Sequence, residues 1–380
     1  VAALARIAYR RGIAVAPFKP QNMSNNAAAC EDGGEIGRAQ ALQALAAGLS
    51  PHVDFNPVLL KPQTDRTSQV VVHGRPASTR EAADYIRERG SLMRPVMESF
   101  HRLTEQYELV IVEGAGSPAE INLRKGDIAN MGFATHAKVP VCLVADIERG
   151  GVIASLVGTQ AVLDPADAAM IRGFIVNKFR GDPSLFDAGV EAIEARTGWR
   201  SFGVVPWLPA TARLPAEDAV SLEPTSSSVQ PKLRIAAPML SRMANFDDAD
   251  PLSQQSDIHF QWVQSGQPIP RDADVIILFG TKSTLGDLQF LREQGWDHDI
   301  LAHAHRGGRV LGICGGYQML GQSIHDPAGV DGPVGRIEGL GLLDVETTMS
   351  SKKTVSPVSG RDVANDTAVS GYEIHACETS

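Results

Sequence analysis

Residues 309–321 read Arg-Val-Leu-Gly-Ile-Cys-Gly-Gly-Tyr-Gln-Met-Leu-Gly, an apolar strand that runs through a glycine turn into a helix. A cysteine at the apex of such a turn projects its sulfur out of the sheet, and the N-terminus of the following helix favours the thiolate. Gly312, Gly315 and Gly316 suit this arrangement, because the turn needs a strained backbone and an uncrowded approach for the substrate. A cysteine beside one glycine is more often a buried structural residue, but three glycines around Cys314 favour a nucleophile.

The length and composition indicate a globular protein of two domains. A chain of 380 residues exceeds what one hydrophobic core usually supports, and its 43% hydrophobic and 21% charged residues are typical of folded proteins. The net charge of −9, without a dense Lys/Arg run, argues against nucleic acid or an anionic membrane as the main partner. No apolar run reaches the ~18–20 residues of a membrane helix, and no signal peptide is visible.

The four cysteines, Cys30, Cys142, Cys314 and Cys377, are scattered along the chain. They show neither CxxC spacing nor histidines at zinc-ligand distances, so no metal site is expected from them. Unpaired cysteines of this kind predict a reducing, cytoplasmic location.

From residue 13 to about 208, short β-branched runs alternate with helical stretches, which predicts a mostly parallel sheet with helices on both faces. In such sheets ligands bind at the carboxyl ends of the strands, so the residues that follow each strand deserve the closest reading. The expected strands are 13–17, 109–113, 139–146, 173–178 and 201–205.

Two of these strands end in residues suited to a nucleotide. Glu113 ends a buried run and is followed by Gly114-Ala115-Gly116-Ser117, where a carboxylate and a glycine loop suit a magnesium ion and phosphates. Asn177 and Lys178 end another strand and resemble pairs that contact a purine edge. The second signal is weak alone and gains weight beside the first.

Two other polar stretches are open to a structural interpretation. Residues 18–26 form a polar loop that contains Lys19 and several amides, and such a loop is more often solvated than functional. Glu35 is expected in the first turn of a helix over 35–45, where the helix macrodipole favours an acid. That placement explains Glu35 without a metal.

A Ser/Pro-rich stretch over 222–232 predicts a linker between the two domains. We therefore expect a first domain over 1–222, a linker over 223–232 and a second domain over 233–380. The second domain is expected to hold another parallel sheet, with strands 233–238, 259–263, 275–279 and 309–313.

Taken together, these motifs resemble the cobyric acid synthase family, the glutamine-dependent amidotransferases of cobalamin biosynthesis. The resemblance spans essentially the whole chain, and its local run around Cys314 is similar to the nucleophile elbow of class I glutamine amidotransferases. The matching stretches are 17–26, 35–40, 113–123, 146–151 and 312–321.

The resemblance implies an α/β fold in which a P-loop NTPase-like domain, similar to dethiobiotin synthetase, precedes a class I glutamine amidotransferase-like domain. It implies ATP and Mg²⁺ as cofactors, with Glu113 and Glu35 as metal ligands and Asn177 facing the adenine. The loop around Lys19 is an alternative cradle for the phosphates.

In the second domain the resemblance implies glutamine as the nitrogen donor and Cys314 as the residue that forms a glutamyl thioester. The backbone N–H of Gly315 and one from the Gly280 loop are then the expected oxyanion hole. His375 matches a family segment that is not the catalytic base, and we interpret it as structural.

The implied reaction amidates carboxylates b, d, e and g of a corrinoid, adenosylcobyrinic acid a,c-diamide, through acyl phosphates. The alternatives are the related cobyrinic acid a,c-diamide synthase, another amidoligase such as the one that amidates lipid II, and a non-catalytic ATPase-like binding protein. Cys314 in an intact elbow argues against the last.

The family also has two features that fall outside these 380 residues. Its members begin with a glycine-rich loop ending in Lys-Ser or Lys-Thr, and the histidine that partners the cysteine lies beyond the equivalent of residue 380. Accordingly, residues 1–12 read as the later part of a helix, and residues 371–377 read as a strand without a closing element. The resemblance thus implies a fragment that is inactive by itself.

Overall fold

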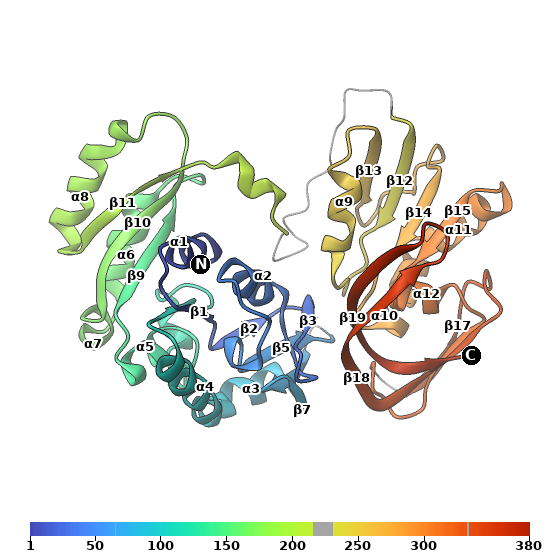
Figure 1. Cartoon of the computed structure of the whole chain (residues 1–380), viewed down its shortest axis with the longest axis horizontal. Coiled ribbons are helices and arrows are strands. Elements are labelled where there is room, and N and C mark those ends of the chain that lie inside the picture. Colours follow the sequence, from blue (N-terminus) through green and yellow to red (C-terminus); the bar gives the residue numbers. More distant parts are fainter. Residues whose placement is uncertain (65, 216–230, 333) are drawn as a thin grey trace.

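The computed structural model describes residues 1–64, 66–215, 231–332 and 334–380 of the chain. Figure 1 shows two α/β domains side by side. Most of the expected linker, 223–232, lies outside the described residues. No helix within the described part of the chain is both long and apolar enough to span a membrane.

Parallel strands in the first domain occur in two groups. In the smaller group, β1 (Val15–Phe18) pairs with β8 (Leu109–Val112). In the larger group, the strand order is β11 (Arg200–Pro206), β10 (Ile171–Phe179) and β9 (Val141–Asp146). The five expected strands are confirmed to within about two residues at most ends, although they form two sheets.

The first domain also contains two small sheets that the sequence did not predict. A four-stranded sheet has the order β2 (Gln21–Met23), β5 (Val58–Pro62), β6 (Thr67–Val72) and β7 (Arg75–Glu81). A two-stranded ribbon pairs β3 (Ala27–Ala29) with β4 (Glu35–Gly37) in antiparallel fashion.

The expectation that a helix begins at Glu35 is therefore wrong. Glu35 lies in strand β4, and helix α2 begins three residues later, at Arg38. No acidic residue lies in the first turn of α2, so the helix macrodipole does not account for Glu35.

Eight α-helices are described in the first domain. They cover its sheets, and the two largest apolar cores lie around the rings of Phe18, Phe100 and Phe133 and around Phe174. The helices are α1 (Ala2–Arg10), α2 (Arg38–Ala46), α3 (Ala82–Glu88), α4 (Met93–Gln106), α5 (Met131–Ala137), α6 (Val152–Val162), α7 (Pro165–Ala168) and α8 (Asp187–Thr197).

The second domain is built on the expected parallel sheet. Its strand order is β13 (Ile258–Val263), β12 (Leu233–Pro238), β14 (Val275–Leu278) and β15 (Arg309–Gly312), and the four predicted strands are confirmed. The helices of this domain are α9 (Asp250–Ser253), α10 (Thr284–Glu293), α11 (Trp296–His305) and α12 (Gly315–Met319).

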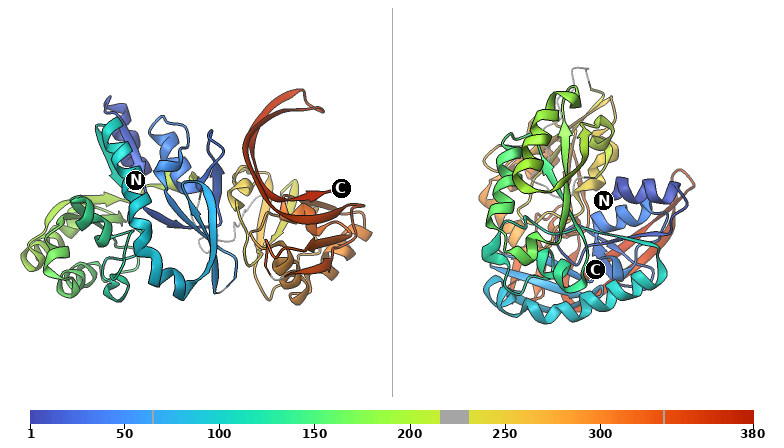
Figure 2. Two further views of the ribbon diagram at one scale, coloured as in Figure 1. Left: turned by 90° about the horizontal axis from the view of Figure 1, so that it is seen from below. Right: turned by 90° about the vertical axis from the view of Figure 1, so that its left-hand side faces the viewer.

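A second sheet in this domain ends in a long hairpin. Its order is β17 (Gly335–Glu338), β16 (Ser323–Asp326), β18 (Glu346–Asp362) and β19 (Thr367–Thr379). The β18–β19 hairpin curves away from the parallel sheet (Figure 2) and contacts β3 of the first domain. The hairpin therefore joins the two domains.

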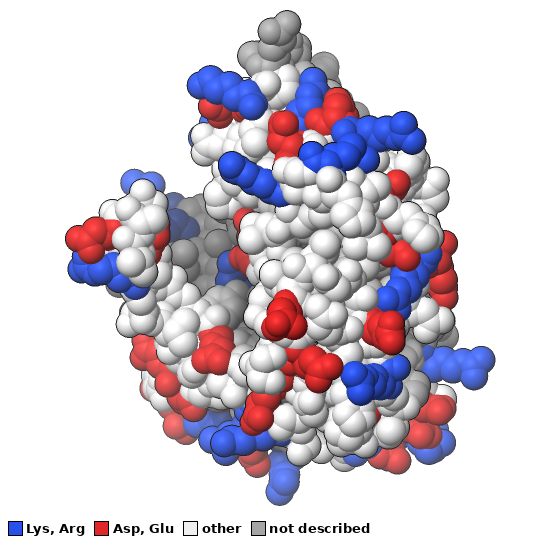
Figure 3. Space-filling model, turned by 90° about the vertical axis from the view of Figure 1, so that its right-hand side faces the viewer, with Lys and Arg blue, Asp and Glu red and all other residues white. Residues whose placement is uncertain are grey.

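Charged residues on the outer face of the second domain are mixed in sign. Figure 3 shows Lys and Arg side chains interspersed with Asp and Glu side chains, and uncharged surface lies between them. The described residues of this face therefore form no extended patch of a single sign.

Candidate active site

Cys314 occupies a sharp turn between β15 and α12, as the sequence predicted. Its φ of 50° lies in the left-handed region, which is strained for a residue with a side chain. The neighbouring glycines leave no space for larger residues: a Cβ on Gly316 would lie 2.0 Å from the carbonyl oxygen of Leu278, and one on Gly312 would lie 2.5 Å from Cα of Tyr317. The elbow thus depends on both glycines.

The two residues expected to form an oxyanion hole lie beside this cysteine. A Cβ built on Gly280 would be 3.5 Å from Cβ of Cys314, and the backbone N–H of Gly315 donates toward the sulfur. The carbonyl oxygen of Gly280 accepts a hydrogen bond of 2.8 Å from the backbone N–H of Ala244. The positions suit the expected role of Gly280 and Gly315, which stays a prediction.

Asp287 holds the loop that follows Gly280. Its carboxylate accepts hydrogen bonds from the hydroxyls of Ser241, at 2.5 Å, and Thr281, and from the backbone N–H of Arg242 at 3.0 Å. Because the three donors come from two loops, Asp287 fixes one loop against the other. The sequence analysis did not single out this residue.

The pKa of Cys314 is raised, whereas the sequence analysis expected the helix N-terminus to favour the thiolate. The thiol is exposed, but the surrounding protein raises its pKa through desolvation, and Asp331 adds to this rise. The N–H of Gly315 and the charge of Lys61 oppose the rise without cancelling it. The helix N-terminus alone does not favour the thiolate here, because desolvation outweighs it.

Cys314 faces a cavity of about 870 Å³ that both domains line. The second domain contributes Cys314, Gly280 and Lys282, and the first contributes Asn25, Arg38 and Lys61. The sequence motifs did not predict that loops of the first domain complete the surroundings of the cysteine.

Glu35 lies next to this cavity and is completely buried. Lys61 donates to one of its oxygens at 2.8 Å, and Lys353 of the second domain forms an ion pair with the other. Burial alone would raise the pKa of Glu35, but the two lysines outweigh it and lower the pKa to about 2. With both oxygens occupied by lysines, Glu35 is poorly suited to the predicted role of a magnesium ligand.

Several further titratable groups around the cavity have shifted pKa values, among them two lysines and an aspartate. Burial and the nearby charge of Lys61 lower the pKa of Lys282, and the same two causes lower that of Lys353 to about 7. Burial raises the pKa of Asp331 to about 7. No local sequence signal marks these residues, because each is brought here from a different part of the chain.

Several contacts across the domain boundary position the cavity walls. Arg38 donates to Asp247 at 2.8 Å and to the hydroxyl of Tyr372, and its guanidinium lies 5.5 Å from the centre of the Tyr372 ring. The backbone N–H of Asn245 donates to Asn26 at 2.7 Å, and its side chain accepts from Ala27 at 3.0 Å. The first turn of α2 is thereby fixed to the second domain.

The structure brings Lys19 and Glu113 together at a separate place in the first domain. The ammonium of Lys19 lies 3.0 Å from Glu113, and Gln43 donates to the other carboxylate oxygen at 2.5 Å. The loop after Glu113 is fixed by Asn130, which donates to the carbonyl of Ala115 at 2.6 Å and accepts from its N–H at 3.0 Å.

The surroundings of Glu113 offer few ligands for a metal ion. Among the described residues, no group of three or more His, Cys, Asp or Glu side chains could coordinate a metal ion. Magnesium commonly needs only one or two carboxylates when phosphate oxygens and water complete its shell. Glu113 is paired with one lysine and Glu35 with two, so Glu113 is the better candidate, and its role as a metal ligand stays a prediction.

Asn177 lies on β10, in a different sheet from β1 and β8, the strands that Lys19 and Glu113 follow. It is the register partner of Asp146 on β9, and the next residue, Lys178, forms an ion pair of 2.8 Å with Asp146. The contact of Asn177 with an adenine stays a prediction. The expected structural role of His375 fits its contacts, because its ring nitrogens are engaged by Glu373 and by the carbonyl of Cys377.

Comparison with known families accounts for both domains. Residues 1–222 match the CobQ/CobB/MinD/ParA nucleotide binding domain, and residues 234–380 match the CobB/CobQ-like glutamine amidotransferase domain. The elbow thus lies in a domain of the amidotransferase type, and its cavity lies between that domain and the nucleotide-binding one. Glu113 and Lys19 lie in a domain of the nucleotide-binding type.

Individual proteins are similar along the whole chain. Cobyric acid synthase of Hyphomonas neptunium is 67% identical over 376 residues, which are 99% of this chain and 76% of that protein. Those of Paracoccus denitrificans and Rhodobacter capsulatus are 64% and 61% identical, over 99% and 100% of this chain and 78% of each relative. Since the similarity is this high over both domains, the chain belongs to the cobyric acid synthase family.

Proposed function

We propose that the protein catalyses the ATP- and glutamine-dependent amidation of peripheral carboxylates on a corrinoid. The substrate is adenosylcobyrinic acid a,c-diamide, carboxylates b, d, e and g are converted to amides, and the product is adenosylcobyric acid. The names of the relatives and the pairing of a nucleotide-binding with an amidotransferase domain support this reaction.

Release of ammonia is assigned to the second domain. The sulfur of Cys314 attacks the side-chain amide carbon of glutamine, a thioester forms, ammonia leaves, and water then releases glutamate. The N–H groups of Gly315 and the Gly280 loop would stabilise the negative charge that develops on the amide oxygen. The position of Cys314 in a strained turn, facing a cavity shared with the first domain, is the observation that carries the proposal.

Activation of the carboxylate is assigned to the first domain. A carboxylate is a poor electrophile, so an oxygen of the substrate attacks the terminal phosphorus of ATP, ADP leaves, and ammonia then displaces phosphate from the acyl carbon. Glu113 would hold magnesium, which neutralises charge on the phosphates. Lys19, within ion-pair distance of Glu113, fixes the orientation of that carboxylate.

The test separates the two nitrogen sources. In the intact enzyme, Cys314→Ser should abolish amidation with glutamine and leave amidation with a high concentration of ammonium salt close to the unaltered rate. Cys142→Ser, at an exposed cysteine outside the cavity, is the matched control. Equal loss of both activities in Cys314→Ser would contradict the division of labour, and full retention of both would remove Cys314 from the mechanism.

A further inference from the structure

A second cavity, of about 240 Å³, lies within the first domain. One wall is the loop that follows Glu113, with Ala115 and Ser117, and the opposite walls come from the β2-β5-β6-β7 sheet and from α3. Much of its lining is apolar: Met23, Leu60, Val70, Ile86, Pro118 and Leu123. The cavity thus adjoins the loop to which we assign phosphoryl chemistry.

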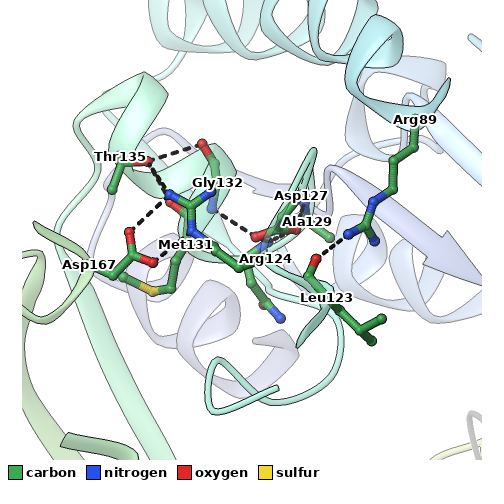
Figure 4. A network of polar contacts seen from close by, with 10 residues as sticks. Arg89, Leu123, Arg124, Asp127, Ala129, Met131, Gly132, Thr135 and Asp167 are labelled. Atoms are coloured by element: carbon green, nitrogen blue, oxygen red, sulfur yellow. Dashed lines mark hydrogen bonds and ion pairs between the residues drawn. The ribbon is translucent and has the colours of Figure 1, made fainter. Parts of the chain in front are cut away.

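Arg89 is the buried charged residue in this cavity. Its exposed fraction is 9%. One terminal nitrogen donates to the carbonyl oxygens of Leu123 and, at 3.1 Å, of Lys125 (Figure 4). The Nε atom is buried and has no hydrogen-bond partner among the described residues. A buried N–H without a partner is costly, so a bound water, ion or ligand near Arg89 would lower that cost.

The other arginines that line the cavity already have carboxylate partners. Arg124 forms hydrogen bonds of 2.6 and 3.0 Å with Asp167 (Figure 4), and Arg80 forms an ion pair with Glu88. Among the described residues, no carboxylate lies within ion-pair distance of Arg89. Arg89 is therefore the one cavity arginine without an ion pair in the described part of the chain.

Two acidic residues, Glu120 and Asp127, also line the cavity, and neither lies within ion-pair distance of Arg89. The carboxylate of Asp127 accepts hydrogen bonds of 2.8 Å from the backbone N–H groups of both Ala129 and Gly132 (Figure 4). Glu120 is exposed beside Gly116. Arg89 thus lines the cavity without a carboxylate partner among the described residues.

We propose that this cavity binds a carboxylated side arm of the corrinoid substrate and that Arg89 anchors the carboxylate. The inference rests on the proposed function and adds a substrate site to it. A cavity of this size admits an acetate or propionate arm but excludes the macrocycle. Arginine is well suited to bind carboxylates, because its planar guanidinium offers several donors in fixed directions.

The lining favours a carboxylate arm over a phosphate group of the nucleotide. Phosphates are commonly bound by successive backbone N–H groups of glycine loops and helix N-termini. Away from the loop that follows Glu113, this cavity offers apolar side chains and the buried guanidinium of Arg89, which match the methylene groups and the terminal charge of an acidic arm. If the cavity binds a corrinoid carboxylate, replacing Arg89 should weaken corrinoid binding. If it binds a phosphate of the nucleotide, the same replacement should weaken ATP binding.

The site should also distinguish substrate from product. Amidation converts a carboxylate into a neutral amide, which forms a weaker hydrogen bond to arginine than a carboxylate does. In the proposed reaction four carboxylates become amides. An arm should therefore leave the cavity more readily once it has reacted.

The test measures corrinoid binding to the intact enzyme by equilibrium dialysis, with detection by visible absorbance. We expect Arg89→Met to weaken binding of adenosylcobyrinic acid a,c-diamide about tenfold, in line with the loss of a charged hydrogen bond. Its preference for this substrate over adenosylcobyric acid should fall by a similar factor. ATP binding and glutaminase activity should stay unchanged. Arg87→Met, at an exposed arginine of α3 that pairs with Asp84 and precedes Arg89 by two residues, is the matched control.

A second variant covers the case in which Arg89→Met does not fold. Met23 lines the cavity and is 56% exposed, so Met23→Glu adds a carboxylate at little cost in stability and should likewise weaken binding of the substrate. Binding within twofold of the unaltered enzyme in both variants overturns the site. Loss of ATP binding with corrinoid binding retained assigns the anion to the nucleotide and also overturns it. If the unaltered enzyme binds no corrinoid, the proposed function itself fails.

Discussion

Glu35 of the first domain and Lys353 of the second, 318 residues apart in the chain, form a buried ion pair at the domain boundary. Lys61 binds the other oxygen of Glu35 at 2.8 Å. One carboxylate thus separates two lysines that would otherwise repel each other. The contact lies beside the cavity that contains Cys314, so it couples the domain boundary to the candidate glutaminase site.

Replacing Glu35 should destabilise the protein. Glu35→Gln leaves two buried lysines without a countercharge, and removal of one partner from a buried ion pair commonly costs about 3 kcal/mol or more. Urea denaturation at pH 6 measures the change in the free energy of unfolding. Glu346→Gln, which breaks an exposed ion pair with Arg336, should change it by less than about 1 kcal/mol. Equal effects of the two substitutions would contradict a special role for Glu35.

The contribution of Glu35 should depend on pH in a defined direction. Its folded-state pKa of about 2 lies below the ordinary value of 4.5, so its stabilising effect is fully present above pH 4.5 and is lost as the pH falls toward 2. The stability difference between the unaltered protein and Glu35→Gln should shrink over this window. Urea titrations at several pH values between 6 and 2 measure it, and a constant difference would refute the assignment.

Arg38 should be needed for amidation with glutamine more than for amidation with ammonia. Arg38→Met removes the hydrogen bond to Asp247 and the contact with Tyr372, so the loops that complete the cavity are less well held. Amidation with glutamine should fall several-fold, and amidation with ammonia should fall much less. The ratio of the two rates is the measurement. Tyr372→Phe retains the ring and loses the hydroxyl, so its ratio should lie between those of Arg38→Met and the unaltered enzyme.

Glu113 should be required for ATP-dependent turnover. Glu113→Gln retains size and removes the charge that binds magnesium, so amidation with ammonia should fall by far more than tenfold, a factor that corresponds to about 1.4 kcal/mol. Glutaminase activity should survive, because Cys314 lies in the other domain. Gln43→Leu removes the hydrogen bond to Glu113 but leaves its charge, and it should have a smaller effect. Turnover within tenfold in Glu113→Gln would exclude Glu113 as a metal ligand.

The reactivity of Cys314 should rise steeply with pH. Desolvation raises its pKa above the ordinary value of 9.0, so the reactive thiolate is scarce at neutral pH and its population increases up to and beyond pH 9. The rate of alkylation by iodoacetamide, followed by mass spectrometry of the Cys314 peptide, measures this rise. Lys61→Met removes a charge that lowers the pKa and should slow alkylation further. A rate that levels off below pH 8 would disprove the raised pKa.

The sequence predicted the parallel sheets better than the two small sheets of the first domain. Buried parallel strands such as β12 are long apolar runs, and β12 was placed at its observed bounds. Strands β2, β3 and β4 have only three residues each, too few for an alternating pattern to be recognised. Glu35 was therefore assigned to a helix that begins three residues too early.

The elbow was predictable because its determinants are neighbours in the sequence. Gly312, Cys314 and Gly316 lie within five positions, and the structure needs each of them. The lysines around Glu35 gave no such signal, since Lys61 and Lys353 meet only after both domains have folded. Likewise, Arg89 resembles any arginine at the end of a helical stretch until its burial and its unpartnered Nε are known.

The hairpin of β18 and β19 has a consequence for synthesis on the ribosome. Glu35 emerges 318 residues before Lys353, an interval of roughly 15–60 s at the usual rates of translation. During that interval the first domain can fold, but the surface formed by β3 and β4 remains open to water, and Glu35 has only Lys61 as a countercharge. The wall of the cavity that Lys353 and Tyr372 provide is therefore added late in the growth of the chain.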